Sequence, residues 1–210
     1  MSITIIIIFI TVAISIYTFS NHELFYKFLM NPYAVANQKA YYRFITSGFI
    51  HADYVHLGFN MFTLYFFGRN VEQFFAAQFG NSASYLFVCF YLLAIIISEV
   101  PTFLKHRNNP NYNSLGASGG VAAVLFASII IFPTNIISIY AIIPIPGFVV
   151  GILYLIYSYY MSRRGKDNIN HDAHFYGAIF GVLFILIIHP GVIDNFLYEL
   201  QNFDLQELMK

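Results

Sequence analysis

The chain has 210 residues, of which 59% are hydrophobic and only 10% are charged, against roughly 45–50% and about 25% in soluble domains. This composition indicates a protein of the lipid bilayer and excludes an ordinary soluble domain. The 10 lysine and arginine residues balance the 10 aspartate and glutamate residues, so we expect no nucleic-acid partner. The single cysteine, Cys89, excludes an intramolecular disulfide and argues against a cysteine-based metal site.

Six stretches are candidates for membrane-spanning helices, each of which needs about 20 mostly apolar residues to cross a hydrocarbon core about 30 Å thick. We therefore predict an all-α polytopic membrane protein that forms a single domain over residues 1–210. The first span is expected to be a retained helix, because the N-terminus lacks the positive start and cleavage site of a signal peptide. The predicted spans cover about residues 3–19, 52–67, 82–103, 116–132, 147–161 and 173–188.

Two of the connecting segments have distinctive compositions. About residues 20–50 are polar and rich in aromatic rings, which prefer the water–lipid interface. We expect a large first loop of short helices at the membrane surface there. Pro133 and Pro144 interrupt the long uncharged stretch that follows residue 116, because proline lacks the amide that a helix interior requires. An apolar interfacial segment is predicted between the fourth and fifth spans.

Three polar residues lie near the starts of alternate spans: His56 in the second, Ser118 in the fourth and His174 in the sixth. Two crossings separate each consecutive pair, so all three must lie near the same face of the membrane. At 1.5 Å per residue, each lies within roughly a few turns of that face. These residues, although far apart in the sequence, are candidates for one pocket that water reaches from one side.

A serine hydroxyl becomes an effective nucleophile when a positioned base removes its proton, and histidine is the usual base near neutral pH. We expect His174 to be that base for Ser118. Gly177 and Gly181 follow His174 in a small-xxx-small pattern, which lets two membrane helices approach closely. Gly119-Gly120 is expected to supply the matching flat surface on the fourth span.

Acyl transfer also needs hydrogen-bond donors for the oxyanion that develops on the attacked carbonyl, and the loss of one donor costs about 2.7–4 kcal/mol. His56 and Asn60 are four residues apart and share one helix face, and both can donate through side-chain nitrogen. The backbone N–H of Ser118 can join them, because the first amides of a helix have no internal partner. Polar groups at membrane depth are unfavourable, so their convergence indicates a functional cavity.

Several of these segments match one known pattern. Gly116-Ala117-Ser118-Gly119 resembles the catalytic motif of the rhomboid family of intramembrane serine proteases, and the run 51–60 resembles its span-two pattern of two histidines and an asparagine. The segment 173–177 resembles the base-bearing start of span six, and Tyr42-Arg43 resembles the Trp-Arg pair of the first loop. The resemblance extends from about residue 42 to residue 181, and it implies a six-transmembrane-helix bundle with a large interfacial first loop.

The resemblance also implies roles for individual residues. It implies a serine endopeptidase with a Ser118–His174 dyad that cleaves other membrane proteins in or beside a transmembrane segment, with His56, Asn60 and the Ser118 amide as oxyanion donors. We expect transmembrane substrates and membrane lipid as partners, no cofactor, no metal, a monomer and a bacterial inner membrane. Structural support is expected from His51, Arg43, Gly116, Gly119, Gly177 and Gly181.

The chain departs from the family pattern in three respects. Tyr42 replaces the usual tryptophan of the first loop. Ala122, one turn after Ser118, replaces a tyrosine or phenylalanine that packs on the catalytic histidine in relatives, so His174 is held by another ring or held less firmly. The charges predict the orientation opposite to that of bacterial relatives, because basic residues favour the cytoplasmic side. The first, third and fifth loops hold Lys27, Lys39, Arg43, Lys105, Arg107, Arg163, Arg164 and Lys166, whereas the other side holds Arg69 and Lys210.

Other polar residues have structural interpretations. Asp172 or Asn170 is expected to cap the last span rather than to complete a triad. Glu99, near a proline, is expected at the membrane interface, and Arg69 is expected to form a local pair with Glu72, three residues further along the chain.

Three functions stay open at this point: a protease, a catalytically silent relative that binds transmembrane helices, and a small-solute transporter. A transporter predicts inverted repeats and broken helices, and neither is clear in the sequence. His171 and His174 have a spacing compatible with metal ligation, but no HExxH motif or acidic cluster accompanies them. The order Gly116-x-Ser118-x-Gly120 also fits the nucleophile elbow of soluble hydrolases, which requires a preceding strand that the sequence does not predict.

Overall fold

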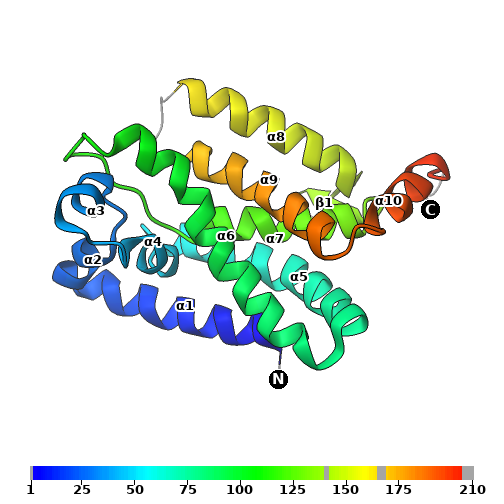
Figure 1. Ribbon diagram of the computed structural model, residues 1–210, viewed down its shortest axis with the longest axis horizontal. Helices are drawn as coiled ribbons and strands as arrows, with labels where there is room; N and C mark the ends of the chain where they lie inside the picture. The colour runs from blue at the N-terminus through cyan, green and yellow to red at the C-terminus, as the bar shows by residue number, and fades with distance from the viewer. Residues whose placement is uncertain (1, 140–141, 165–168, 205–210) are drawn as a thin grey trace.

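The computed structural model describes residues 2–139, 142–164 and 169–204, which form a bundle of α-helices with one short β-hairpin (Figure 1). The described elements, in chain order, are α1 (Ile3–Ser20), α2 (His22–Phe28), α3 (Pro32–Gln38), α4 (Arg43–Thr46), a 3-10 turn (Ser47–Phe49), α5 (Tyr54–Phe79), a second 3-10 turn (Gly80–Ser82), α6 (Ala83–His106), α7 (Ser118–Ile131), β1 (Ile136–Ile139), β2 (Ile143–Pro146), α8 (Gly147–Arg164), α9 (His171–Ile188) and α10 (Val192–Gln201).

A helix occupies each of the six predicted span positions, namely α1, α5, α6, α7, α8 and α9. Among the described residues, three stretches are long and apolar enough to cross a bilayer: Ile3–Ser20, Tyr54–His106 and His171–Ile188. The second stretch contains both α5 and α6, and Ser118–Ile131 is apolar but shorter. The fold is therefore that of a helical membrane protein, and the exact number of crossings stays a prediction.

Helix α5 continues to Phe79, beyond residue 67, where the second predicted span ends. Of the polar residues in this part of the helix, Glu72 faces the start of α1. The Glu72 carboxylate accepts hydrogen bonds from the Ser2 hydroxyl at 2.6 Å and the Ile3 amide at 2.7 Å. The expected pair of Arg69 with Glu72 is therefore wrong: Glu72 caps α1, where the first amides need acceptors.

The first loop folds into the short helices α2, α3 and α4, as its composition predicted. Asn31 caps α3 by accepting a hydrogen bond from the Ala34 amide at 2.7 Å. Arg43 closes the loop, because its guanidinium donates to the carbonyl of Tyr26 at 3.0 Å and to that of Leu29 at 2.6 Å. The Thr46 hydroxyl also donates to the Phe28 carbonyl at 3.0 Å, so two side chains fix α4 against the end of α2.

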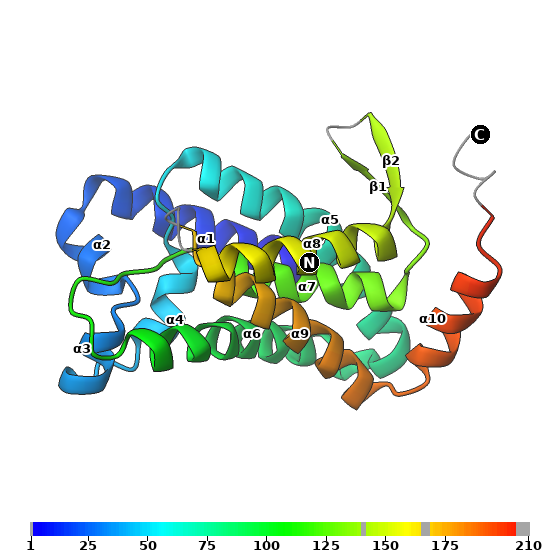
Figure 2. The ribbon, with the colours of Figure 1, turned by 90° about the horizontal axis from the view of Figure 1, so that it is seen from above.

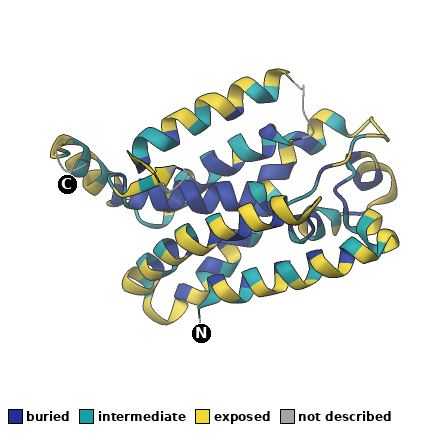
Figure 3. Cartoon of the chain, turned by 180° about the vertical axis from the view of Figure 1, so that it is seen from behind, coloured by how far each residue is buried: buried dark blue, intermediate teal, exposed yellow. Residues whose placement is uncertain are grey.

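Helix α7 forms the centre of the bundle, and α5, α6, α8 and α9 surround it. Every residue of α7 after Ser118 is buried, and Figure 3 shows the helix as a continuous band of buried residues. This burial explains why the sequence from Gly119 to Ile131 carries no charge and shows no polar face. A helix that is apolar all round lies inside a bundle.

Glycines bring α7 and α9 into backbone contact. A Cβ atom at Gly177 would collide with the Gly119 carbonyl, and one at Gly181 would collide with the Ala123 carbonyl. This agrees with the predicted close approach of the two helices. The expectation that Gly120 contacts the sixth span is wrong, because a Cβ atom at Gly120 would lie closest to Ile95 and Tyr91 of α6 rather than to α9.

Two elements differ from the predicted pattern. The expected apolar segment between the fourth and fifth spans is an antiparallel hairpin of β1 and β2, with Ile136 opposite Pro146, and Figure 2 shows that it projects from the bundle. Helix α10 was not predicted, because it is short and half of its residues are polar. Its apolar residues Ile193, Phe196 and Leu197 have helical spacing, which was the available signal.

Candidate active site

Ser118 is the first residue of α7 and is half-buried. The chain reaches it through Gly116, whose φ of +114° lies in the region that favours glycine. A Cβ atom at Gly116 would also lie 2.7 Å from Cε1 of His56. Gly116 is therefore required twice, for its backbone conformation and for the close approach of the histidine ring.

His56 lies in the first turn of α5, which Asp53 caps. The Asp53 carboxylate accepts a hydrogen bond from the His56 amide at 2.7 Å, and Asn60 donates through Nδ2 to the His56 carbonyl at 2.9 Å. Asn60 is buried, whereas His56 is half-buried. An amide nitrogen carries two hydrogens, so Asn60 keeps one for a further acceptor on the same helix face.

His51 connects α1 to the segment that precedes Ser118. The Ser15 hydroxyl donates to the Phe49 carbonyl at 3.0 Å, so it accepts from Nδ1–H of His51 at 2.9 Å. Nε2 of His51 then accepts from the Ala117 amide at 3.4 Å. This arrangement requires the neutral imidazole with its proton on Nδ1.

The environment of His51 agrees with a neutral ring. The side chain is fully buried, and its ring centroid lies 5.0 Å from that of His56. Burial, and to a lesser extent the charge on His56, lower the pKa of His51 to about 3, against the opposing effect of the Asp53 carboxylate. His51 therefore stays uncharged at physiological pH and acts as a structural link.

The first loop is also tied directly to the segment before Ser118. Met30 and Ser114 exchange backbone hydrogen bonds at 3.0 and 2.9 Å, and the Gly116 amide donates to the Ser47 carbonyl at 2.9 Å. Together with the His51 contact on Ala117, these bonds fix three of the four residues that precede α7. The predicted structural role of His51 thus extends beyond the first loop to the Ser118 segment itself.

His174 lies in the first turn of α9, beside the start of α7. The Ala173 carbonyl is 3.4 Å from the position that a Cβ atom at Gly119 would take. Ser118 and His174 are the chain neighbours of these two contacting residues, so their side chains begin from adjoining backbones. The structure thus brings the backbones next to Ser118 and His174 together, at the end of the bundle where α5, α7 and α9 all begin (Figure 1).

Tyr154 of α8 supplies an aromatic ring beside His174, which relatives obtain from the position that Ala122 occupies in this chain. Its ring stacks on that of His174, with centroids 6.3 Å apart and an interplanar angle of 26°. The sequence shows the gap at Ala122 but does not show which ring replaces it. Gly147, Gly151 and Ser158 are the buried residues of α8, and Tyr154 follows the same helical stripe, which was the available signal.

A buried carboxylate connects the starts of α7 and α9. Glu99 of α6 is 7% exposed, and it accepts hydrogen bonds from Ser114 at 3.2 Å and from Nδ2 of Asn170 at 3.2 Å. Asn170 caps α9 by accepting from the Ala173 amide at 3.1 Å and also accepts from the Thr102 hydroxyl at 3.0 Å.

Glu99, which was expected at the membrane interface, is an internal acceptor that joins α6, the Ser118 segment and the cap of α9; its depth in the membrane stays a prediction. Of the two cap candidates, Asn170 is the cap, and Asp172 instead forms an ion pair with Lys105 at 2.7 Å. A carboxylate within an apolar helix was itself a signal of such a role.

The site is a cluster of hydrogen-bond donors and acceptors. His171 and His174 have ring centroids 5.8 Å apart, but within the described part of the chain no group of three or more His, Cys, Asp or Glu residues is placed to hold a metal ion. The chemistry that these residues support is proton transfer and oxyanion stabilisation.

Comparison with known proteins identifies the family. The family model of the Rhomboid domain matches residues 38–191, which include the whole site around Ser118 and His174. The chain belongs to the rhomboid family. Rhomboid membership, together with the long apolar helices, makes it a multi-pass integral membrane protein.

Two curated relatives are plant proteins. RHOMBOID-like protein 12, mitochondrial, from Arabidopsis thaliana is 31% identical over 166 residues, which are 72% of this rhomboid chain and 49% of the relative. Rhomboid-like protein 11, chloroplastic, from the same plant is 30% identical over 168 residues, 74% of this chain and 55% of the relative. The chain thus spans about half the length of the curated relatives it matches.

Proposed function

We propose that this rhomboid is an intramembrane serine endopeptidase that cleaves transmembrane proteins in or near their membrane segment. The observation that carries the proposal is the meeting of the starts of α7 and α9, which brings the Ser118 and His174 backbones together beside His56. All three side chains are half-buried rather than sealed, so a substrate and water can reach them.

In the proposed reaction, His174 removes the proton from the Ser118 hydroxyl as its Oγ attacks the scissile carbonyl. The tetrahedral intermediate collapses when His174 returns that proton to the leaving amine. Water then repeats the sequence on the acyl-enzyme and releases the new carboxyl end. The ring of Tyr154 holds the imidazole in orientation during both proton transfers.

The oxyanion of the intermediate has three proposed donors: a ring N–H of His56, the remaining Nδ2 hydrogen of Asn60 and the amide of Ser118. The first two share one face of α5, and Gly116 lets the His56 ring approach the Ser118 segment. The Ser118 amide belongs to the first turn of α7, whose amides lack helical partners. Each donor is expected to lower the barrier by about 2.7–4 kcal/mol.

A second candidate function is that of a catalytically silent relative that binds transmembrane helices without cleaving them. The observation that favours it is Ala122, where an aromatic support is expected, and the names of both relatives say only that they are rhomboid-like. The two functions differ in whether Ser118 is activated, which can be measured directly.

The deciding experiment labels the purified full chain with a fluorophosphonate probe and follows cleavage of a model transmembrane substrate in proteoliposomes. We expect labelling and cleavage by the natural chain, loss of both in Ser118→Ala, and loss of both in His174→Ala. Ser82→Ala, at an exposed serine in the turn that precedes α6, is the control that should retain both. Absence of labelling in the natural chain would instead support the silent relative.

We also propose the partners and the oligomeric state of the protein. Substrates are transmembrane proteins, the surrounding partner is lipid, and the active form is a monomer without a cofactor. The bacterial inner membrane stays a prediction, and the two relatives carry mitochondrial and chloroplastic in their names.

A further inference from the structure

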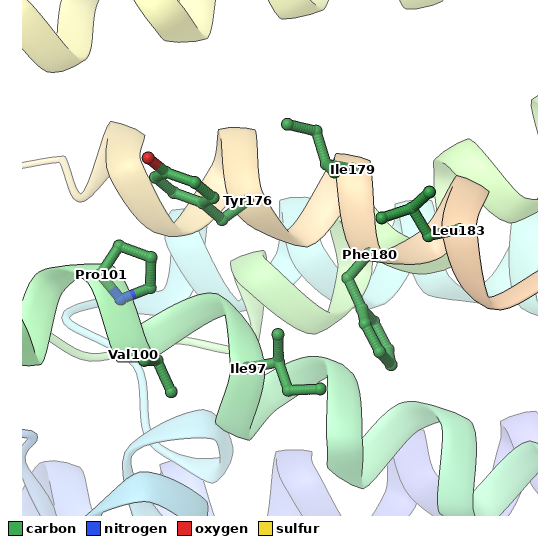
Figure 4. Close-up of a pocket in the computed structure, with 7 residues that line it drawn as sticks. All are labelled: Ile97, Val100, Pro101, Tyr176, Ile179, Phe180 and Leu183. Carbon is green, nitrogen blue, oxygen red and sulfur yellow. The ribbon is translucent and has the colours of Figure 1, made fainter.

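An apolar groove of about 400 Å³ runs along the outside of the bundle between α6 and α9, away from the dyad. Figure 4 shows its lining residues along the neighbouring lengths of α6 and α9. Every lining residue is apolar except for one tyrosine hydroxyl. The lining residues are Ile97, Val100 and Pro101 of α6 and Tyr176, Ile179, Phe180 and Leu183 of α9.

A second, polar pocket of about 220 Å³ continues the groove at the end where α6 and α8 finish and α9 begins. Pro101 and Tyr176 line both spaces. The polar pocket adds two cations, Lys105 and Arg163, and one carboxylate, Asp172. The charged groups that face this pocket among its lining residues therefore sum to one positive charge.

We propose that the groove and the polar pocket together bind one glycerophospholipid with an anionic headgroup. Its phosphate occupies the polar pocket beside Arg163 and Lys105, and one acyl chain lies in the groove between α6 and α9. Basic pockets between membrane helices suit anionic headgroups because the attraction adds to the burial of the acyl chain.

The dimensions of the groove match those of a single acyl chain. On α9 the combined site extends from Asp172 of the polar pocket to Leu183 of the groove, and at about 1.5 Å per residue these two residues are about 16 Å apart along the helix. Half of a hydrocarbon core of about 30 Å is about 15 Å. A lipid whose phosphate lies at the Asp172 level can therefore extend one chain along the groove to the bilayer midplane.

The charges distinguish this site from the general lipid coat. Lys105 is already paired with Asp172 at 2.7 Å, whereas Arg163 is exposed and lies over the Tyr159 ring at 5.3 Å. Arg163 therefore supplies the positive charge that Asp172 does not balance. A neutral zwitterionic headgroup adds no net charge to such a pocket, so the pocket selects an anionic lipid.

The test compares variants of the full chain by native mass spectrometry in detergent, with phosphatidylglycerol and phosphatidylcholine of identical acyl chains. We expect the natural chain to retain phosphatidylglycerol preferentially, and Arg163→Gln to bind it about fivefold more weakly, as about 1 kcal/mol per basic residue implies. Arg69→Gln is the matched control, because Arg69 is also exposed and lies over a tyrosine ring, at 5.5 Å, near the other end of the bundle.

The acyl-chain position has its own test, with a phosphatidylglycerol that carries a photoreactive diazirine near the end of one chain. We expect cross-links to α6 and α9 that Ile179→Trp abolishes by filling the groove. Ile187→Trp is the control, because Ile187 is 77% exposed on the same helix and does not line the groove.

Three results would overturn the proposal: equal retention of the two lipids, equal weakening by Arg163→Gln and Arg69→Gln, or cross-links that ignore Ile179→Trp. Displacement of the lipid by inorganic phosphate at the same concentration would also overturn it, because it would identify a site for the free anion. Melting curves of each variant show whether the bundle is intact, and loss of lipid selectivity in an intact Arg163→Gln chain supports the site.

Discussion

Helices α7 and α8 both contribute residues to the proposed site, but they differ in how far they are buried. Helix α7, which begins with Ser118, is buried along its remaining length. Helix α8, which supplies Tyr154, lies at the edge, and among its residues only Gly147, Gly151 and Ser158 are buried (Figures 1 and 3). The nucleophile therefore belongs to the most enclosed helix and the support of the base to one of the most exposed.

Because of this difference, the Ser118 segment is held rigidly, whereas the Tyr154 ring can adjust. The Ser118 segment is fixed from three directions, by backbone bonds from Ser47 and Met30 and by the His51 ring. The Tyr154 ring touches His174 from a helix that packs on the bundle along one narrow stripe. Changes in α7 are therefore expected to disturb the fold, and changes in α8 to disturb only the site.

The largest effect is expected where α7 and α9 meet. Gly181→Ala places a Cβ atom onto the Ala123 carbonyl, and because backbone lies on both sides, neither helix can yield without moving. Overpacking of a close-packed core costs about 1–3 kcal/mol, occasionally more, and we expect the upper end here. Thermal melting of the detergent-solubilised protein, followed by light scattering, measures the loss.

Gly58→Ala is the matched control for that change. Gly58 lies within α5, and nothing lies within 4 Å of the position that its Cβ atom would take. We expect its melting temperature to equal or exceed that of the natural chain, because alanine is the better helix former. If the two alanine variants melted alike, the backbone contact of α7 with α9 would not be the principal constraint on the bundle.

A smaller effect, confined to the site, is expected from Tyr154. Tyr154→Leu removes the ring that stacks on His174 and is expected to lower the cleavage rate about tenfold, which corresponds to about 1.4 kcal/mol in the barrier. Tyr154→Phe keeps the ring and should stay near the natural rate. Because the ring acts through His174, the loss should be in kcat rather than in KM.

The control for Tyr154 is Tyr160→Leu on the same helix, where the exposed ring contacts Arg164 instead of the site. We expect its cleavage rate and melting temperature to match those of the natural chain. Equal rates for Tyr154→Leu and Tyr160→Leu would show that the orientation of His174 depends on its own helix and not on α8.

The difference between α7 and α8 also explains which parts of the fold could be predicted. Apolar stretches locate helices well, because hydrophobic length is a local property, and all six predicted positions contain a helix. The partner of Glu72 lies in α1, some 70 residues away in the chain. Such long-range contacts leave no local pattern, and a polar residue then resembles the end of a span.

The candidate site shows the same limit. Two predicted membrane crossings separate each consecutive pair among His56, Ser118 and His174, so all three are expected near one face. This inference needs only the count of helices. It could not show that Tyr154 replaces the aromatic ring missing at Ala122, because the two positions lie on different helices. Nor could it show that Glu99 turns inward, since only the packing of α6 against Asn170 and Ser114 makes an internal acceptor necessary.

The smallest predicted effect is a dependence of the free energy of unfolding on pH, and it comes from His51, which helps to fix the Ser118 segment. The pKa of His51 is lowered to about 3 in the folded chain, against about 6.5 for an unperturbed histidine. As the pH falls below about 6.5, the unfolded chain gains a proton that the folded chain does not, so the stabilising contribution of neutral His51 declines from about pH 6.5 towards 3. Between pH 7.5 and 5.5 the expected loss in the free energy of unfolding is about 1 kcal/mol.

Comparison of melting temperatures at pH 7.5 and 5.5 isolates this contribution. His51→Gln cannot titrate but retains an acceptor for the Ala117 amide, so the stability gap between it and the natural chain should narrow as the pH falls. His22→Gln, at an exposed position at the start of α2, should follow the natural chain at both pH values. A constant gap would mean that His51 takes up a proton in the folded chain, and the Ser118 segment would then be held by its backbone bonds to Ser47 and Met30 rather than by a neutral histidine.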